Sequence, residues 1–143
     1  MCWGRYLVVV GLMCAAADAP EAAKELERFK GTWILVSVEE NGVKHSGDEI
    51  GDNRLTFEGD KYVQYFQKMA IEEGSIKLDP SKKPPTIDLV ITSGRDKGKT
   101  QLGIYEFRED VLRVCTSRPG EAARPTEFDG KKYIIFTLKR EKQ

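Results

Sequence analysis

Short runs of alternating apolar and polar residues, separated by turn residues, recur along most of this 143-residue chain. Such runs are typical of β-strands, and their spacing is typical of all-β folds. The connections between them are too short for the helices that join parallel strands. The sequence therefore predicts antiparallel strands that follow one another in chain order. About eight are expected, over residues 32–38, 54–58, 61–67, 71–78, 86–92, 100–107, 111–117 and 132–140.

The turn residues support this order. Asn41-Gly42 is a strong signal for a tight turn, and Gly59-Asp60 and Glu109-Asp110 fit two further hairpins. Residues 44–53 hold too much glycine and aspartate for a strand, so we expect a loop there, with room for one helical turn. Residues 118–130 form the longest predicted loop.

Eight strands linked mainly by hairpins favour an up-and-down barrel, because closure removes the exposed edges of an open sheet. The predicted fold class is therefore all-β, an eight-stranded antiparallel barrel with a short N-terminal helix. A barrel of this size is either filled by side chains or holds one small ligand, and the sequence leaves both possibilities open.

The predicted helix begins near Asp18-Ala19-Pro20-Glu21, which supplies a capping acid, an early proline and an acid in the first turn. Gly31 ends it. Leu26 and Phe29 are three residues apart and share one face. We expect that face to lie against one end of the barrel.

The first seventeen residues resemble a secretory leader. Arg5 provides a positive start, residues 6–13 form an apolar run, and residues 15–17 are alanines at the spacing that a signal peptidase requires. We interpret 1–17 as a signal peptide and 18–143 as the mature barrel domain, exported to the periplasm or the extracellular space. The apolar run is too short for a transmembrane anchor. A buried N-terminal helix is the alternative.

Cys14 raises the possibility of a lipoprotein, but Met13 occupies the position where that signal requires Gly or Ala. Removal of the leader also removes Cys2 and Cys14 and leaves Cys115 as the single cysteine. An intramolecular disulfide is then impossible, so core packing and sheet hydrogen bonds must stabilise the domain. Cys115 lies in a predicted strand and is expected to be an inert, packed thiol.

The charge distribution and the reactive residue types exclude several classes of function. The chain carries 23 basic and 23 acidic residues, which alternate without forming blocks, so no nucleic-acid partner is predicted. The single histidine, His45, lies in a predicted loop, which excludes a His-rich zinc site. No motif of a nucleophilic enzyme or a phosphate loop is present in the sequence. No cofactor or metal is therefore predicted, and an enzyme is the least favoured function.

Candidate ligand contacts follow from the period of two. Trp33 with Leu35, and Phe57 with Leu55, are expected to point inward, and Tyr62, Gln64 and Phe66 share a face. Asp88 interrupts an apolar strand and is expected on the outer face, with an inward ligand contact as the alternative. Arg124 in the long loop either binds an anion at the barrel mouth or belongs to a loop that Pro119 and Pro125 stiffen and Phe128 anchors. The predicted ligand-binding residues are Trp33, Leu35, Phe57, Tyr62, Gln64, Phe66 and Arg124.

The sequence Gly31-Thr32-Trp33, after a short helix, resembles the lipocalin and wider calycin pattern. In that pattern the tryptophan plugs one barrel end, and a basic residue from the last strand packs over it. Lys139 and Arg140 are the residues here that match this position. The resemblance therefore implies a cation–π contact with Trp33.

A broader resemblance covers nearly the whole mature chain. It is to a lipocalin-like family of small exported domains that is abundant in planctomycete bacteria and has no established activity. This resemblance implies the fold and the export, but no catalytic residues. The segments that carry it are Gly31-Thr32-Trp33 with Val36-Ser37, residues 55–60, Lys83-Pro84 with residues 86–89, residues 97–100, Gly103-Ile104-Tyr105 and residues 124–128.

The sequence is compatible with two functions. The first is an exported binding module that holds a small apolar or amphipathic ligand, which requires a cavity inside the barrel. The second is a non-catalytic structural or interaction protein of the cell envelope, which requires a filled core and an exposed apolar patch for a partner protein. The sequence leaves the ligand and the oligomeric state open.

Overall fold

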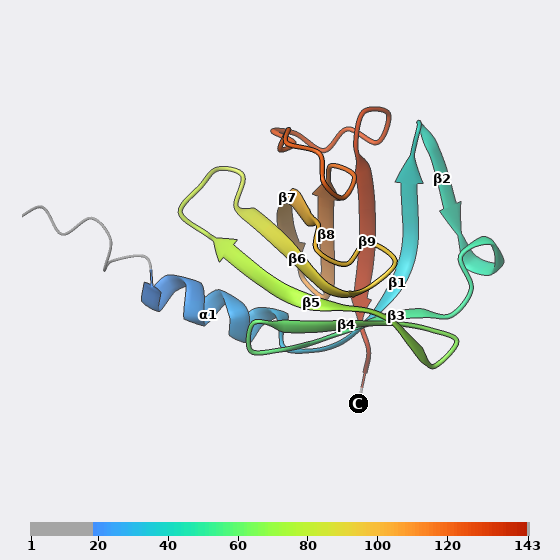
Figure 1. Ribbon diagram of the computed structural model, residues 1–143, viewed down its shortest axis with the longest axis horizontal. Coiled ribbons are helices and arrows are strands. Elements are labelled where there is room, and N and C mark those ends of the chain that lie inside the picture. Colours follow the sequence, from blue (N-terminus) through green and yellow to red (C-terminus); the bar gives the residue numbers. More distant parts are fainter. Residues whose placement is uncertain (1–18, 143) are drawn as a thin grey trace, which may run out of the picture.

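Nine strands and one α-helix are present in residues 19–142, the part of the chain that the computed structural model describes (Figure 1). The predicted leader lies outside these residues. The helix is α1 (Ala19–Phe29). The strands are β1 (Gly31–Glu40), β2 (Val43–Ser46), β3 (Asn53–Glu58), β4 (Lys61–Phe66), β5 (Met69–Asp79), β6 (Thr86–Gly94), β7 (Thr100–Arg108), β8 (Val111–Thr116) and β9 (Ile134–Arg140).

Eight of these strands close into a barrel. From β3 to β9, each strand pairs antiparallel with the next one along the chain, and β1 pairs with both β3 and β9. The pairing of β1 with β9 runs from Trp33 opposite Arg140 to Glu39 opposite Ile135. The predicted eight-stranded antiparallel barrel is confirmed.

The ninth strand corrects the prediction for residues 44–53. The prediction of a loop throughout this segment is wrong, because β2 pairs with the second half of β1, where β1 is no longer paired with β3. The free edge of β1 supplies the hydrogen bonds that the weak local strand propensity of the segment does not predict. The helical turn is present as the 3₁₀ helix η1 (Gly47–Glu49).

Helix α1 lies beside the strand ends at one end of the barrel (Figure 1). The ring of Phe29 is fully buried and makes edge contacts with Phe57, Tyr105 and Phe107, at centroid distances of 5.4, 5.2 and 5.1 Å. Leu26 packs against the same core. The predicted position of the helix is confirmed. None of the described helices has the length and apolarity needed to cross a membrane.

Trp33 and Arg140 join α1 to the barrel. The guanidinium of Arg140 lies 4.2 Å from the ring centroid of Trp33 and donates hydrogen bonds to the carbonyls of Arg28 and Lys30, at 2.6 and 2.7 Å. Trp33 Nε1 donates to the carbonyl of Phe29 at 2.8 Å. Carbonyls at a helix C-terminus lack partners within the helix, so these bonds satisfy them. The expected basic residue over the tryptophan is Arg140, while Lys139 is exposed.

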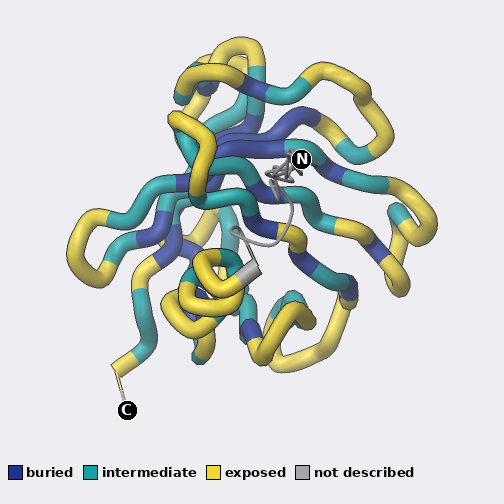
Figure 2. The backbone as a smooth tube through the Cα atoms, turned by 90° about the vertical axis from the view of Figure 1, so that its left-hand side faces the viewer, coloured by how far each residue is buried: buried dark blue, intermediate teal, exposed yellow. Residues whose placement is uncertain are grey.

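Buried positions alternate with more exposed ones along the strands (Figure 2). The inward positions form the main core inside the barrel. A second, smaller cluster of Ile104, Cys115 and Ile135 is covered by Phe128 and Tyr133, which belong to the connection between β8 and β9. The long connection therefore packs on the outer face of the last strands.

We expect Arg140→Ala to lower the free energy of unfolding by about 2–3 kcal/mol, because it removes two charge-assisted hydrogen bonds and the contact with Trp33. Arg108→Ala is the matched control, since the Arg108 side chain is 75% exposed. Its effect should stay within about 0.5 kcal/mol. Urea denaturation of both variants measures the difference, and equal effects would contradict the structural role of Arg140.

Candidate functional site

The barrel interior is not completely filled. A cavity of about 230 Å³ lies among the inward side chains of all eight barrel strands. Its outermost lining residues, Asp96 and Pro119, belong to the β6–β7 and β8–β9 connections, at the opposite end of the barrel from α1. The lining consists of Leu35, Leu55, Phe57, Tyr62, Gln64, Glu72, Ile87, Leu89, Asp96, Gln101, Val114, Thr116, Pro119, Phe136 and Leu138.

Gly74 in β5 sets the position of one cavity wall. A Cβ atom at this residue would lie 2.6 Å from Cε1 of Tyr62 and 2.3 Å from the carbonyl oxygen of Val90. Only glycine therefore lets the Tyr62 ring lie this close to β5. The ring then extends along the strand, and its hydroxyl donates a hydrogen bond to Glu72 Oε2 at 3.1 Å.

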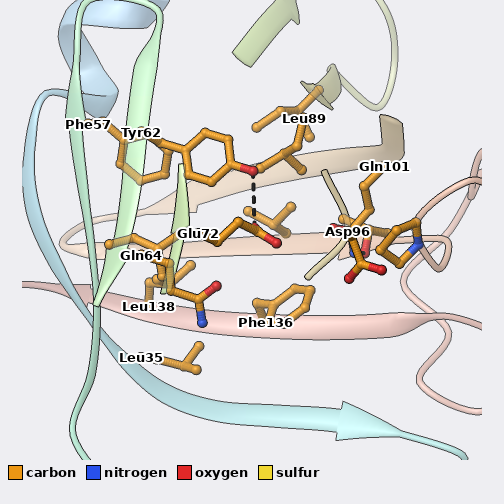
Figure 3. A pocket seen from close by; sticks show the side chains of 15 residues that line it. Leu35, Phe57, Tyr62, Gln64, Glu72, Leu89, Asp96, Gln101, Phe136 and Leu138 are labelled. Carbon is orange, nitrogen blue, oxygen red and sulfur yellow. Dashed lines mark hydrogen bonds between the residues drawn. The ribbon is translucent and has the colours of Figure 1, made fainter. Parts of the chain in front are cut away.

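Polar groups are placed at intervals in a largely apolar lining. Figure 3 shows the Tyr62 hydroxyl above the Glu72 carboxylate, with Asp96 and Gln101 to one side. Gln101 is buried and its Nε2 donates to Thr116 Oγ1 at 2.7 Å. Such a lining is typical of small-molecule sites, in which apolar walls supply affinity and a few polar groups fix orientation.

Burial changes the acidity of the two groups that meet in this wall. It raises the pKa of the Glu72 carboxyl, and the nearby charge of Asp96 raises the pKa further, while the hydrogen bond from Tyr62 opposes the shift. Burial and the neighbouring Glu72 also raise the pKa of Tyr62. The phenol therefore stays protonated at neutral pH and donates the hydrogen bond to Glu72.

Four of the seven predicted ligand-binding residues line the cavity, namely Leu35, Phe57, Tyr62 and Gln64. The other three lie elsewhere. Trp33 belongs to the contact with Arg140 at the α1 end. Phe66, the last residue of β4, lies against Gly51. A Cβ atom added at Gly51 would be 3.1 Å from the Phe66 ring.

Arg124 lies on the outer face of the barrel. Its guanidinium donates to the carbonyls of Ile87 and Gly103, at 3.2 and 2.8 Å, and to Asp88 Oδ1 at 2.5 Å. Asp88 therefore points outward, as predicted. Pro125 is fully buried and Phe128 packs on the outer cluster, so both residues anchor the long loop. This arrangement matches the second expectation for Arg124, in which it belongs to a loop with a structural role.

Several lining residues were not predicted, above all Glu72, Asp96, Gln101 and Thr116. A signal for Glu72 was available, because the period of two places it on the same side of β5 as Ile76 and Leu78, which are buried. Asp96 lies in a turn. Only the path of that turn over the barrel mouth brings its carboxylate to the cavity.

The two residues with the most reactive side chain types lie outside the cavity. His45 is in β2, not in a loop as predicted, and its Nδ1 lies 2.6 Å from Glu49 Oε2. Cys115 is buried on the outer side of the barrel and donates to the carbonyl of Glu127 at 3.6 Å. Burial raises the pKa of its thiol, which disfavours the nucleophilic thiolate.

Comparisons with protein-family models, curated proteins and solved structures find no match to this chain. The cavity therefore carries the functional argument. Among the described residues, no group of three or more His, Cys, Asp or Glu side chains is arranged to hold a metal ion.

We expect Glu72→Gln to stabilise the protein at pH 7. The pKa of the Glu72 carboxyl is raised in the folded state, so its ionised form destabilises the fold. This destabilisation is complete at a pH above the folded pKa, and it is absent at a pH below the unfolded pKa of about 4.3. The advantage of the variant should therefore shrink as the pH falls through the folded pKa toward this value. Denaturation curves between pH 4 and pH 7 measure it.

Glu73→Gln is the control for loss of one negative charge, because Glu73 is the exposed neighbour of Glu72 in β5. A Glu72→Gln variant that is less stable than the parent at pH 7, or whose advantage is constant with pH, would contradict the proposed cost of burying this carboxyl.

Proposed function

We propose that this protein is a binding module that holds one small amphipathic molecule inside its barrel. The observation that carries the proposal is the cavity of about 230 Å³ with a mainly apolar lining. It exceeds the apolar cavity of about 150 Å³ that suffices to bind benzene. A molecule of one ring with a short substituent therefore fits this space.

The cavity also favours this function over the alternative of a non-catalytic envelope protein with a filled core. A protein that only presents an outer face to a partner gains nothing from an internal space, and unfilled volume lowers stability. The polar groups in the lining also favour a binding function. Gln64, Glu72 and Gln101 place hydrogen-bonding atoms beside apolar walls, which suits a ligand with both kinds of surface.

Val114→Phe tests this function. Val114 lines the cavity, so a phenyl group there should occupy the space and weaken binding of indole at least about tenfold, at a stability cost of about 1–3 kcal/mol. Isothermal titration calorimetry with indole provides the affinity. Val90→Phe makes the same change at a position that is 40% exposed and should leave the affinity unaltered.

The proposal fails if indole binds neither the parent protein nor the Val90→Phe control. It also fails if indole binds Val114→Phe as tightly as the parent, because the probe would then occupy another place.

We further propose that the module acts outside the cytoplasm and is lipocalin-like in the sense of the exported planctomycete domains that it resembles. The support is the sequence of residues 1–17 and the motifs of the mature chain. The Trp33–Arg140 contact agrees with this kinship. A domain with one cysteine, buried and unpaired, also suits an oxidising compartment, because it offers no exposed thiol for wrong disulfides.

Export has a direct test. The full chain, expressed in a Gram-negative host, should appear in the periplasmic fraction with Asp18 as its first residue, because Ala15 and Ala17 provide the small residues before the cut. Ala17→Asp should block the cleavage. Intact-mass spectrometry distinguishes the two forms, and an uncleaved parent chain in the cytoplasm would contradict the proposal.

A further inference from the structure

We infer that the ligand of the cavity is an amine, a small molecule with a cationic ammonium group and an apolar body, bound with its charge at Glu72. This inference rests on the proposed binding function and specifies its ligand class. It follows from the charges that line the cavity and from their distribution along its length.

The charged side chains in the lining are both acidic. They are Glu72 and Asp96, and the lining contains no lysine, arginine or histidine. An anionic ligand would bring a third negative charge into a confined space of low dielectric, where repulsion is strong. A neutral apolar ligand would leave the carboxylate of Glu72 with less water and no new partner.

The two acidic residues differ in whether the protein supplies a cationic partner for the carboxylate. Asp96 Oδ1 lies 3.5 Å from Nζ of Lys99, whose side chain is 54% exposed, so Asp96 has a cationic partner at the rim. Glu72 forms no ion pair with any residue from 19 to 142, and its hydrogen bond comes from the neutral hydroxyl of Tyr62. Glu72 is therefore the carboxylate with room for a ligand cation.

The rest of the lining suits the body of such a molecule. Across the cavity from Glu72, Figure 3 shows Leu35, Phe136 and Leu138, which form an apolar wall. Gln64 lies directly opposite Glu72 in the pairing of β4 with β5, so its amide can accept a second hydrogen bond from an ammonium group. Aromatic rings at the same site also favour a cation, through their negative faces.

A series of three probes of nearly equal shape tests the inference. We expect 2-phenylethylamine to bind the parent protein about tenfold more tightly than 2-phenylethanol at pH 7, and phenylacetate to bind most weakly. In Glu72→Gln the preference for the amine over the alcohol should fall to about twofold or less. Glu73→Gln removes an exposed acid from the same strand and should retain the full preference. Isothermal titration calorimetry gives all nine affinities.

The outcomes separate this inference from the proposed function. If the alcohol binds the parent as well as the amine does, or if Glu72→Gln keeps the full preference, the amine inference is overturned while a binding cavity stands. If indole binds to the parent protein but none of the three probes does, the amine inference is likewise overturned and the binding cavity stands. If indole also fails to bind, the proposed function and the inference fall together.

Discussion

Closure of the barrel depends on the pairing of β1 with β9, and at the end of that pairing Trp33 and Arg140 lie opposite each other. The two side chains stack, and both donate to carbonyls at the C-terminus of α1. Three segments that are distant in sequence are thereby joined at one point. Because β1 and β9 pair with each other, this junction also removes two long exposed edges at which an open sheet would associate with other chains.

The same junction explains why the free space lies at the other end. Phe29 enters the barrel from α1 and meets three aromatic rings, which fill the interior on that side. The opposite end is bounded by turns and by the β8–β9 connection, from which Phe128 and Tyr133 pack on the outer face of the barrel while Pro119 reaches the cavity lining. The interior near the mouth therefore contains mainly strand side chains, with Asp96 and Pro119 from the connections, and together they do not fill it.

Local rules are sufficient for the eight barrel strands, the hairpins between them and the position of α1, because the period of two, the turn residues and the Leu26–Phe29 spacing act within a few residues. Strand β2 was missed because its stability comes from the free edge of β1, which exists only after the barrel has formed. The cavity was predicted in part. Leu35 and Tyr62 follow from alternation, whereas Asp96 depends on the path of a turn, and Arg124 on the path of a long loop to Asp88.

The balance of 23 basic and 23 acidic residues in the sequence conceals the character of the site. Most of these charges are solvated, and water and salt screen them over about 10 Å. Glu72 is different because it is partly buried in the cavity wall, so its charge is less screened by water and its pKa is raised. A molecule with zero net charge can therefore have a site with a strong electrostatic preference, since the field in the cavity depends on the few charges that line it and not on the total.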